Sequence, residues 1–426
     1  MRSRRDILRL GGGVAGALGL SRAGFPRLAR AESSLPGEDL KFLFVMMYGG
    51  WDPTRVFAPE FDNPLVDMEP DAVPATIGGL NIVDHIWRPS VRSFLERQHS
   101  RSVILNGLSL PSVGHVECLR FSMTGDTTGT SPDWAALLAA GQRDRYGLPH
   151  VIVSGPEFPG EYGSLVARVG TNGQTVKLLS GELLATSDLA TSLPTISAQS
   201  QVDAWLAKRA KTLGKSARSP IHKSLIQNWE DVLVRSHTLE TLADTVAWNC
   251  GSTLSTQIEL AVDLFRLDVA RCVTLTPFIF EDIDSHADND ERQTRDFEEL
   301  FAGLNSLMDR LEATPGVKAP TLADEVVIVC MSEMGRTPQL NGGLGKDHWG
   351  TTSVFMCGPN LTGDRTVGSF GEYYGGEPID FATGEISASG RRPAGGDFGA
   401  TLLALGGIDP GDALPNHAPI EGMLAG

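Results

Sequence analysis

The sequence lacks the cysteine patterns of disulfide-bonded and redox proteins. Its 426 residues include five isolated cysteines and no CxxC motif, and an odd count of this kind argues against a disulfide framework, although one disulfide stays open. There is also no CxxCH haem site, no cysteine cluster and no GxGxxG fingerprint after a predicted strand, which argues against redox function. The cysteines are Cys118, Cys250, Cys272, Cys330 and Cys357.

Positive charge is scarce as well. The chain carries 36 lysines and arginines against 52 aspartates and glutamates, a formal net charge of −16. Such a surface repels nucleic acid and anionic membranes. An anionic substrate would therefore need local cations, from a metal ion or an arginine, to be held.

Long hydrophobic runs are missing, and the first residues resemble an export signal. Residues 3–9 (SRRDILR) form a twin-arginine pattern, followed by a weakly apolar stretch at residues 10–20 and a small-x-small site at residues 29–31. The apolar stretch is too short and glycine-rich to span a bilayer stably, and no other segment approaches the roughly 20 apolar residues required.

We therefore expect a signal peptide over residues 1–31, the twin-arginine export machinery as a partner, and a periplasmic or secreted protein. An uncleaved signal anchor is the alternative. Cleavage would remove seven arginines and one aspartate and change the formal charge from −16 to −22. Because this route carries folded proteins, a metal ion could be loaded before export.

Strand and helix patterns alternate along the remaining chain. Each helical stretch of apolar residues at 3.6-residue spacing feeds a strand, which is typical of right-handed βαβ crossovers. The sequence predicts an α/β fold with a doubly wound, mostly parallel sheet covered by helices on both faces. The predicted strands are residues 41–47, 102–106, 150–154, 273–280 and 325–331, and the predicted helices are residues 224–248, 256–269 and 294–314.

We expect one domain over residues 32–426. Residues 155–219 are polar and less periodic, which indicates an insertion or cap. Residues 358–396 are rich in glycine and turn formers, which favours a loop excursion near the site.

Three of the predicted strands are followed by groups able to hold a metal ion. Asp52 follows the first strand, Asp284 and His286 follow the strand at 273–280, and Glu333 follows the strand at 325–331 with His348 downstream. The carboxyl ends of parallel strands share one edge of a sheet, so these side chains can converge on one site. Asp52 could instead cap the next helix, and the acidic residues around Asp284 could form a solvated loop.

Arg336 lies three residues after Glu333, in the segment Ser332-Glu333-Met334-Gly335-Arg336-Thr337-Pro338. Its guanidinium could hold a sulfate, phosphate or carboxylate oxygen through a bidentate pair. An internal salt bridge between Arg336 and Glu333 is the alternative. That alternative does not explain why His348 lies in a similar loop.

Together these motifs resemble a known family. Gly-Gly-x-Asp at residues 49–52, Asp-x-His at 284–286, Ser-Glu-x-Gly-Arg-Thr-Pro at 332–338 and Asp-His-Trp at 347–349 are similar to the exported bacterial family called domain of unknown function 1501. That family resembles the alkaline phosphatase and sulfatase superfamily. The resemblance extends from about Lys41 to the end of the chain, where residues 397–408 are similar to the closing helix of sulfatases.

The resemblance implies an alkaline phosphatase-like sheet whose strand ends hold one or two divalent ions of zinc, calcium, magnesium or manganese. Three departures stand out. Met334 replaces the histidine of an Asp-His pair, the Asp-x-His spacing is tighter than usual, and His115 fills the nucleophile position counted back from the Met123-Thr124-Gly125 element. His115 could attack phosphorus, act as a base on water or bind the ion. It could also be a loop residue hydrogen-bonded to the backbone.

The sequence thus predicts a metal-dependent hydrolase of a phosphate, sulfate or similar ester, with His115 and Arg336 as catalytic residues. The predicted metal ligands are Asp52, Asp284, His286, Glu333 and His348. The alternative is a non-catalytic exported protein with the same fold and a degraded site, which serves as a binding or assembly partner. Met334 and the missing hydroxyl nucleophile favour this alternative.

Overall fold

The structure is a computed structural model that describes residues 35–170, 196–242, 245–248, 250–277 and 283–425. The predicted signal peptide lies outside the described residues. Contacts along the chain group residues Ser34–Gly426 into one compact unit. Among the helices in the described ranges, none combines the length and apolar character needed to cross a bilayer.

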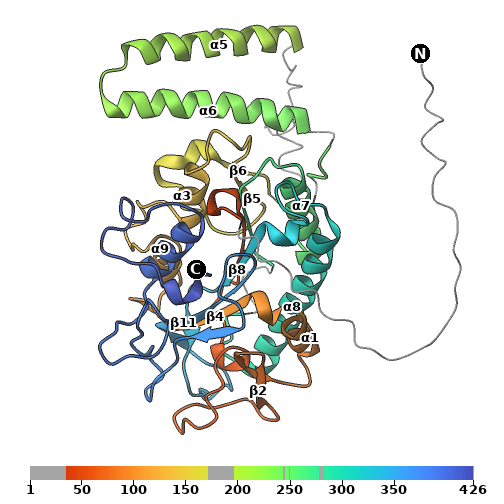
Figure 1. The fold of residues 1–426 in the computed structure, drawn as a ribbon, viewed down its shortest axis with the longest axis vertical. Helices are drawn as coiled ribbons and strands as arrows, with labels where there is room; N and C mark the ends of the chain where they lie inside the picture. The colour runs from red at the N-terminus through yellow and green to blue at the C-terminus, as the bar shows by residue number, and fades with distance from the viewer. Residues whose placement is uncertain (1–34, 171–195, 243–244, 249, 278–282, 426) are drawn as a thin grey trace, which may run out of the picture. The chain divides into compact units, whose positions relative to one another are not determined.

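An eight-stranded sheet forms the centre of this unit, in the order β12-β4-β11-β8-β1-β7-β5-β6 (Figure 1). All neighbouring strands are parallel except β11, which runs antiparallel to both β4 and β8. The strands are β1 Lys41–Met46, β4 Ser102–Ser109, β5 His150–Ile152, β6 Val166–Arg168, β7 Cys272–Leu275, β8 Val326–Met331, β11 Thr351–Cys357 and β12 Arg365–Val367. Two short ribbons, β2 Val73–Ile77 with β3 Leu80–Asp84 and β9 Gly335–Arg336 with β10 His348–Trp349, complete the β structure.

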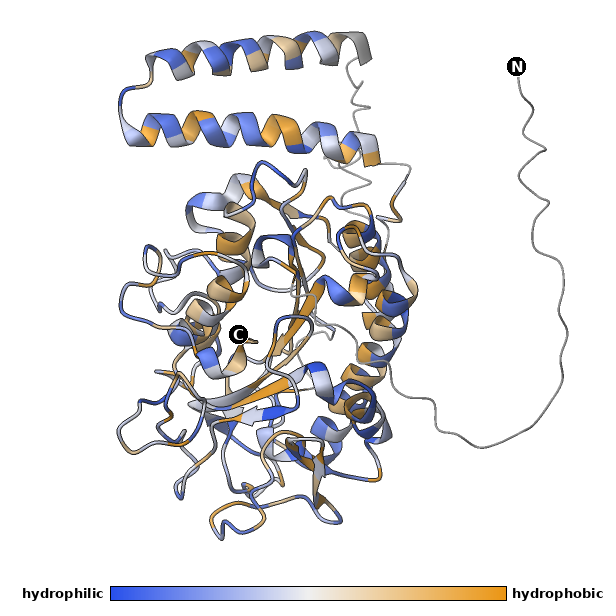
Figure 2. Ribbon diagram, viewed as in Figure 1, coloured by the Kyte–Doolittle hydropathy of each residue, from blue (hydrophilic) through white to orange (hydrophobic). Residues whose placement is uncertain are grey.

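Helices cover both faces of the sheet, as predicted. The α-helices in the described residues are α1 Pro89–Gln98, α2 His115–Thr124, α3 Trp134–Ala140, α5 Ile196–Ser216, α6 Pro220–Leu242, α7 Leu254–Arg266, α8 Asn289–Ala313 and α9 Gly395–Leu405, of which α5 and α6 pack on each other as a hairpin. Figure 2 shows the hydrophobic residues concentrated in the strands and on the inner sides of the helices around them. This confirms the doubly wound, mostly parallel architecture, with β11 as an antiparallel strand that the sequence analysis did not foresee.

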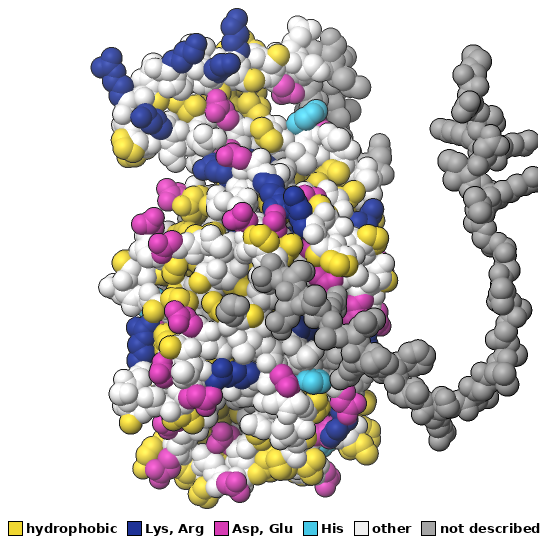
Figure 3. All heavy atoms as spheres, viewed as in Figure 1, with side chains coloured by type: hydrophobic (Ala, Val, Ile, Leu, Met, Phe, Trp, Pro, Cys, Tyr) yellow, Lys and Arg dark blue, Asp and Glu magenta, His cyan; other side chains and the backbone are white. Residues whose placement is uncertain are grey.

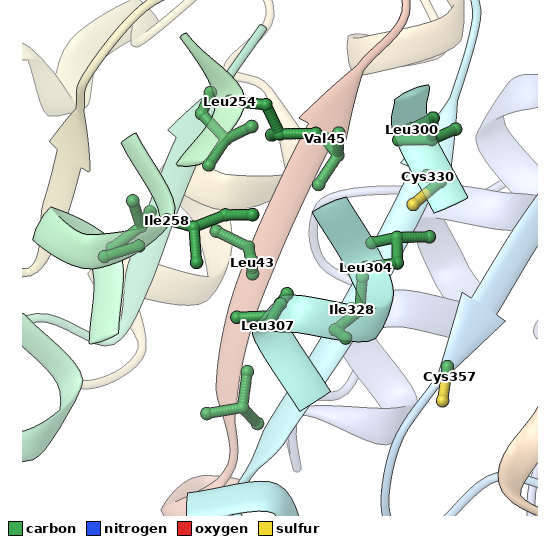
Figure 4. Packing of buried hydrophobic residues seen from close by; sticks show 14 of the residues in the cluster. Leu43, Val45, Leu254, Ile258, Leu300, Leu304, Leu307, Ile328, Cys330 and Cys357 are labelled. Carbon is green, nitrogen blue, oxygen red and sulfur yellow. The ribbon is translucent and has the colours of Figure 1, made fainter. Parts of the chain in front are cut away.

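Strand β1 explains why both faces need cover. All six of its residues are buried, and successive side chains point to opposite faces of a sheet. Leu43 and Val45 belong to one core cluster with Leu304 of α8, whereas Phe42 and Phe44 belong to a second cluster with the residues of α9. Figure 4 shows the first cluster, in which α7 and α8 side chains lie against β1 and β8.

Predicted element bounds differ from the observed ones by a few residues. Strands β1, β4, β5 and β8 lie at their predicted positions. Strand β7, predicted at residues 273–280, begins one residue early, at Cys272, and ends at Leu275, and residues 278–280 lie outside the described residues. The predicted insertion at residues 155–219 contains β6, which is the edge strand of the main sheet, and α5. Residues 171–195 of that insertion lie outside the described residues. The predicted excursion at residues 358–396 contains β12 and the first two residues of α9, and the rest consists of loops, turns and isolated bridges.

Helix α8 supplies the first testable expectation. Leu304 is 1% exposed and packs in the cluster that joins α8 to the sheet. We expect Leu304→Ala to lower the free energy of unfolding by about 2–5 kcal/mol, because the lost apolar contacts leave a cavity. The urea midpoint measures this. Val317→Ala, at a position that is 40% exposed, should change stability by less than about 0.5 kcal/mol, and equal effects of the two variants would contradict the described core.

Candidate metal site

The site residues come from four segments that meet at one edge of the sheet. Strands β1, β7 and β8 run parallel, and β4 runs in the same direction because β11 is antiparallel to both β4 and β8. The segments that follow these strands therefore emerge at their shared carboxyl edge, where ligand sites of open α/β sheets form. Asp284, His115 and Glu333 lie on these segments, and His348 lies on the ribbon strand β10.

Asp284 is the centre of the site. Its Oδ1 atom lies 2.5 Å from an Arg336 nitrogen, 3.2 Å from His348 Nε2 and 3.3 Å from His286 Nε2, and its Oδ2 atom lies 3.4 Å from His115 Nε2. Burial by itself would raise the pKa of Asp284. Hydrogen bonds from His115 and Arg336 outweigh the burial, so this pKa lies well below its usual range and the carboxylate is ionised.

The three histidines around Asp284 share one arrangement. Each has its Nδ1 atom next to an oxygen acceptor: Glu333 Oε1 at 2.7 Å for His115, Asp347 Oδ1 at 2.9 Å for His286, and the Val113 carbonyl at 2.8 Å for His348. An Nδ1–H that donates to such an acceptor aims Nε2 at a shared point, and metal-binding histidines are commonly oriented in this way. Without an ion, the Nε2–H of His115 donates to Asp284, and a bound ion would take the place of that proton. All three Nε2 atoms face the Asp284 carboxylate.

His115, Asp284 and His348 form a set that could hold a metal ion. Their ligand atoms all lie within 4.8 Å of one another. Two imidazole nitrogens and one carboxylate oxygen are donors that suit zinc and similar ions. His286 is not a member of this set, although its Nε2 atom lies 2.9 Å from His348 Nε2. Its side chain is 47% exposed, so it lies on the solvent side of the site.

Glu333 lies behind His115, outside this set. Its side chain is fully buried and accepts hydrogen bonds from the Gly49 backbone N–H and the Ser332 hydroxyl in addition to its contact with His115. Hydrogen bonds with Asp284 and Glu333 raise the pKa of His115 to about 9. The structure therefore revises the expected role of Glu333, which orients a histidine where a metal ligand was predicted.

Arg336 is also fully buried and turned away from solvent. Its guanidinium donates to the carbonyls of Gly49, Gly50 and Lys346 and to Asp284. No nitrogen of the group is left to face a substrate in this conformation. The alternative considered from the sequence, a salt bridge between Arg336 and Glu333, is replaced by a pairing with Asp284. The guanidinium that was expected to hold an anion contacts protein groups instead.

The turn after β1 fits around this guanidinium. Gly49 and Gly50 have φ values of +132° and +86°, in the region that favours glycine. A Cβ atom at Gly50 would lie 2.9 Å from Met334 Cγ and 3.1 Å from Arg336. The glycine pair therefore lets the backbone turn sharply and lets its carbonyls approach Arg336.

Asp52 lies apart from the metal-capable set. Its fully buried carboxylate is 2.9 Å from Lys346 Nζ and 3.5 Å from Arg55, and it accepts hydrogen bonds from Thr54 and Asn289. Burial would raise the pKa of Asp52, but Lys346 and Arg55 lower it below its usual range. Asp52 also caps the 3₁₀ helix Pro53–Arg55. The predicted metal ligand is thus an internal counter-ion and helix cap, which was the alternative interpretation of its sequence position.

Met334 and Cys118, two sulfur-containing side chains close to His115, are buried. Met334 is 0% exposed and packs with Leu110 and Cys118. Cys118 donates to the Ser112 carbonyl, and burial raises its thiol pKa to about 11. Cys118 therefore lacks the thiolate that a nucleophile needs at neutral pH.

Three participants were missed in the sequence analysis. They are Asp347, which orients His286, Lys346, which neutralises Asp52, and the Val113 carbonyl, which orients His348. Lys346 and Asp347 directly precede His348, so their place in the chain was a usable signal. A backbone carbonyl such as that of Val113 leaves no signal in the sequence.

Comparisons with known proteins bear on the family. Residues 264–417 match the family described as "Protein of unknown function (DUF1501)". This match confirms the predicted resemblance for that part of the chain, which includes Asp284, His286, Glu333, Arg336 and His348. No curated protein matches the chain.

Several solved structures are similar at low identity. The lipoteichoic acid synthase LtaP from Listeria monocytogenes is 9% identical with a TM-score of 0.41, over 92% of this chain and 80% of that one. A protein in the alkaline phosphatase superfamily from Vibrio parahaemolyticus is 7% identical with a TM-score of 0.35, over 87% and 67% of the two chains. Phosphonate monoester hydrolase of Agrobacterium radiobacter is 11% identical with a TM-score of 0.31, over 89% and 78%. Similarity at this distance assigns no activity to the chain.

The Asp52 environment leads to a stability prediction. We expect Asp52→Asn to lower the free energy of unfolding by about 3–5 kcal/mol, because Lys346 would be left as a buried, uncompensated charge. The double variant Asp52→Asn/Lys346→Met should recover part of the loss, as measured by urea denaturation. Asp62→Asn, at an exposed position, is the matched control and should stay within about 0.5 kcal/mol of the unaltered chain.

His115 leads to a pH prediction for the chain in chelator. Its folded-state pKa of about 9 lies above the ordinary value of 6.5, so the stability that its protonation contributes is fully present below pH 6.5 and is lost as the pH rises through 9. Urea midpoints measured from pH 6 to 9.5 should decline more steeply for the unaltered chain than for His115→Gln. Parallel profiles for the two chains would show that His115 does not titrate as described.

Proposed function

We propose that this chain is a metal-dependent hydrolase of a small anionic ester, namely a phosphate, a sulfate or a similar group. The proposal rests on one observation above all, the convergence of three histidine Nε2 atoms on the Asp284 carboxylate. Each of these histidines is oriented through Nδ1 by a separate acceptor. A preorganised set of this kind is how proteins hold catalytic ions with an open coordination position.

The residues present fit a single ion. His115, Asp284 and His348 would hold it, and their nitrogen-rich donors favour zinc over calcium or magnesium among the four expected metals. A second ion at Asp52 is disfavoured, because the Lys346 ammonium already neutralises that carboxylate at 2.9 Å. A divalent ion at the site would supply polarisation of the ester oxygen and a lowered pKa for a reacting water.

His286 is the group best placed to move a proton. It is half exposed, and Asp347 holds its Nδ1 atom so that Nε2 faces the Asp284 carboxylate at 3.3 Å. A histidine oriented by a carboxylate in this way can act as a general base or acid. His115, predicted as base or nucleophile, is assigned here as a metal ligand, because its Nδ1 atom is engaged by the buried Glu333 and its Nε2 atom belongs to the metal-capable set.

Binding of an anion does not depend on Arg336 in this proposal. Helix α2 begins at His115, so the partial positive charge of its N-terminus lies beside the site. Together with the ion, this end of the helix would offset the negative charge of an ester on a strongly acidic protein. The substrate class follows from charge and donor chemistry, and the alcohol part of the ester is left open.

Export forms a separate part of the proposal. It rests on the sequence alone, that is, on the twin-arginine pattern at residues 3–9 and the small-x-small site at residues 29–31. We infer from these a signal peptide over residues 1–31 and a periplasmic or secreted mature protein. N-terminal sequencing of the protein from its native compartment tests this part, with Glu32 as the expected first residue.

The competing proposal is a non-catalytic binding or assembly protein. It is favoured by Cys118, which is a buried thiol with its pKa raised to about 11, and by the burial of Arg336. These observations leave no thiolate and no arginine for ester chemistry at this place. The hydrolase proposal is preferred because it explains why three histidines are oriented toward one carboxylate.

Elemental analysis and a hydrolysis screen test the hydrolase proposal. We expect one zinc per chain in protein from its native compartment, and turnover of at least one class among aryl phosphates, phosphodiesters and aryl sulfates that chelation abolishes and zinc restores. Asp284→Ala and His348→Ala should lose the ion, because each removes a ligand. Glu333→Gln should bind it about 10- to 100-fold more weakly, because His115 loses its orienting carboxylate.

His286→Ala separates the roles of the histidines. It should keep the ion and lower the turnover number by about 10²- to 10⁴-fold. His237→Gln, at a side chain that is 84% exposed, is the control and should change neither property. A stoichiometric ion without turnover on any substrate class would favour the binding role, whereas no ion in the unaltered chain would refute the site itself.

A further inference from the structure

Helices α5 and α6 form an antiparallel hairpin whose charge differs from the rest of the chain. The two helices pack along each other, and α6 contacts the 3₁₀ helix Gly160–Leu165 (Figure 1). The whole hairpin, residues 196–242, carries seven basic and four acidic side chains, a net charge of +3 in a chain of net charge −16, and residues 196–223 carry six of the basic side chains and one of the acidic ones. The six basic residues of this first part are Lys208, Arg209, Lys211, Lys215, Arg218 and Lys223.

These cations are available to a partner. All six are exposed, and within the described part of the chain none of them forms an ion pair. Figure 3 shows dark blue side chains gathered over the hairpin at the top of the view, whereas magenta acidic side chains are scattered over the rest of this face. The hairpin is therefore a basic region on an acidic protein.

Large apolar side chains are exposed among these cations. Trp205 is 61% exposed and Val202 is 55% exposed. Residues three and four apart are neighbours on a helix, so Trp205 adjoins Val202, Lys208 and Arg209 on the surface of α5. On α6, Ile221 and Leu225 are 72% and 60% exposed and lie four residues apart.

Leu206, Ala210 and Leu213 lie on a different side of α5. They are less exposed than Trp205 and Val202, and Ile226 of α6 lies against Gly214 at the end of that side. The packing of the hairpin is thus satisfied without Trp205. Exposed apolar side chains that the fold does not use are typical of interaction surfaces.

We propose that the α5–α6 hairpin docks the protein on the surface of an anionic phospholipid bilayer. Tryptophan beside lysine and arginine on a helix is the combination that lies at the boundary between headgroups and acyl chains. The apolar side chains would enter that boundary, and the six cations would contact anionic headgroups. This proposal is independent of the proposed hydrolase activity.

The net charge of the chain does not prevent this contact. Repulsion between exposed charges is screened beyond roughly 8–10 Å at physiological ionic strength, so the charge nearest the bilayer decides the sign of the interaction. A second copy of the chain could also offer acidic groups to the hairpin. That contact would join unlike surfaces and would extend into rings or open filaments, so we favour the bilayer as the occupant.

A dye placed on the hairpin tests the proposal. All five cysteines are buried, so an environment-sensitive dye on Val202→Cys reports the hairpin alone, and a dye on Val317→Cys is the control. With the chain purified as its host cell produces it, the dye at position 202 should shift to shorter wavelength on vesicles containing phosphatidylglycerol and not on pure phosphatidylcholine. The dye at position 317 should not respond to either.

Neutralising variants measure the contribution of charge. Lys208→Gln/Arg209→Gln in the Val202→Cys background should weaken vesicle binding by about 30-fold. Lys318→Gln/Arg392→Gln removes the same charge from exposed positions outside the hairpin and should leave binding within about threefold. Circular dichroism checks that both variants fold.

Several outcomes would overturn the proposal. The first is a dye at position 202 whose emission does not shift on anionic vesicles. The second is equal vesicle binding by the two neutralised variants. The third is a dye shift that also occurs without vesicles, under conditions where sedimentation shows that the protein self-associates. The last outcome would assign the hairpin to contacts between copies. A shift with DNA that matches the shift with vesicles would also overturn it, because it would show general polyanion binding.

Discussion

The guanidinium of Arg336 is the interaction on which the site depends. This buried group donates hydrogen bonds to the carbonyl of Gly50 after β1, to the carbonyl of Lys346 and to the carboxylate of Asp284. A buried arginine needs this many acceptors, because desolvation of the charge is costly unless it is fully hydrogen-bonded. Three loops that are distant in sequence are therefore held in one arrangement before any ligand arrives.

Much of the fold followed from sequence patterns. The continuous apolar run of β1 and the apolar stripe of α8 reflect burial, which depends mainly on residue type and period. Convergence of Asp284, His286 and His348 also followed, because the carboxyl edge of a parallel sheet collects the segments after its strands. The antiparallel strand β11 escaped prediction, since a buried apolar run carries no mark of strand direction.

The individual roles of charged residues were harder to predict. Asp52, Glu333 and Arg336 have the chemistry of a ligand or an anion clamp, yet each is fully buried and engaged by another protein group. Whether a carboxylate binds a metal ion or a lysine depends on which cation the folded chain places beside it. That depends on contacts such as Lys346 with Asp52, across almost 300 residues of chain, which local sequence does not encode.

The two-residue ribbon of β9 and β10 has one further consequence. His348 and Arg336 are directly opposite each other in its register, so the ribbon ties the backbone of a site histidine to the backbone of the arginine that holds Asp284. The entropy cost of fixing His348 is therefore part of the free energy of folding. Binding of an ion would not include this cost. Association and release at such a centre would then be governed by solvent exchange and charge, with little rearrangement of the polypeptide.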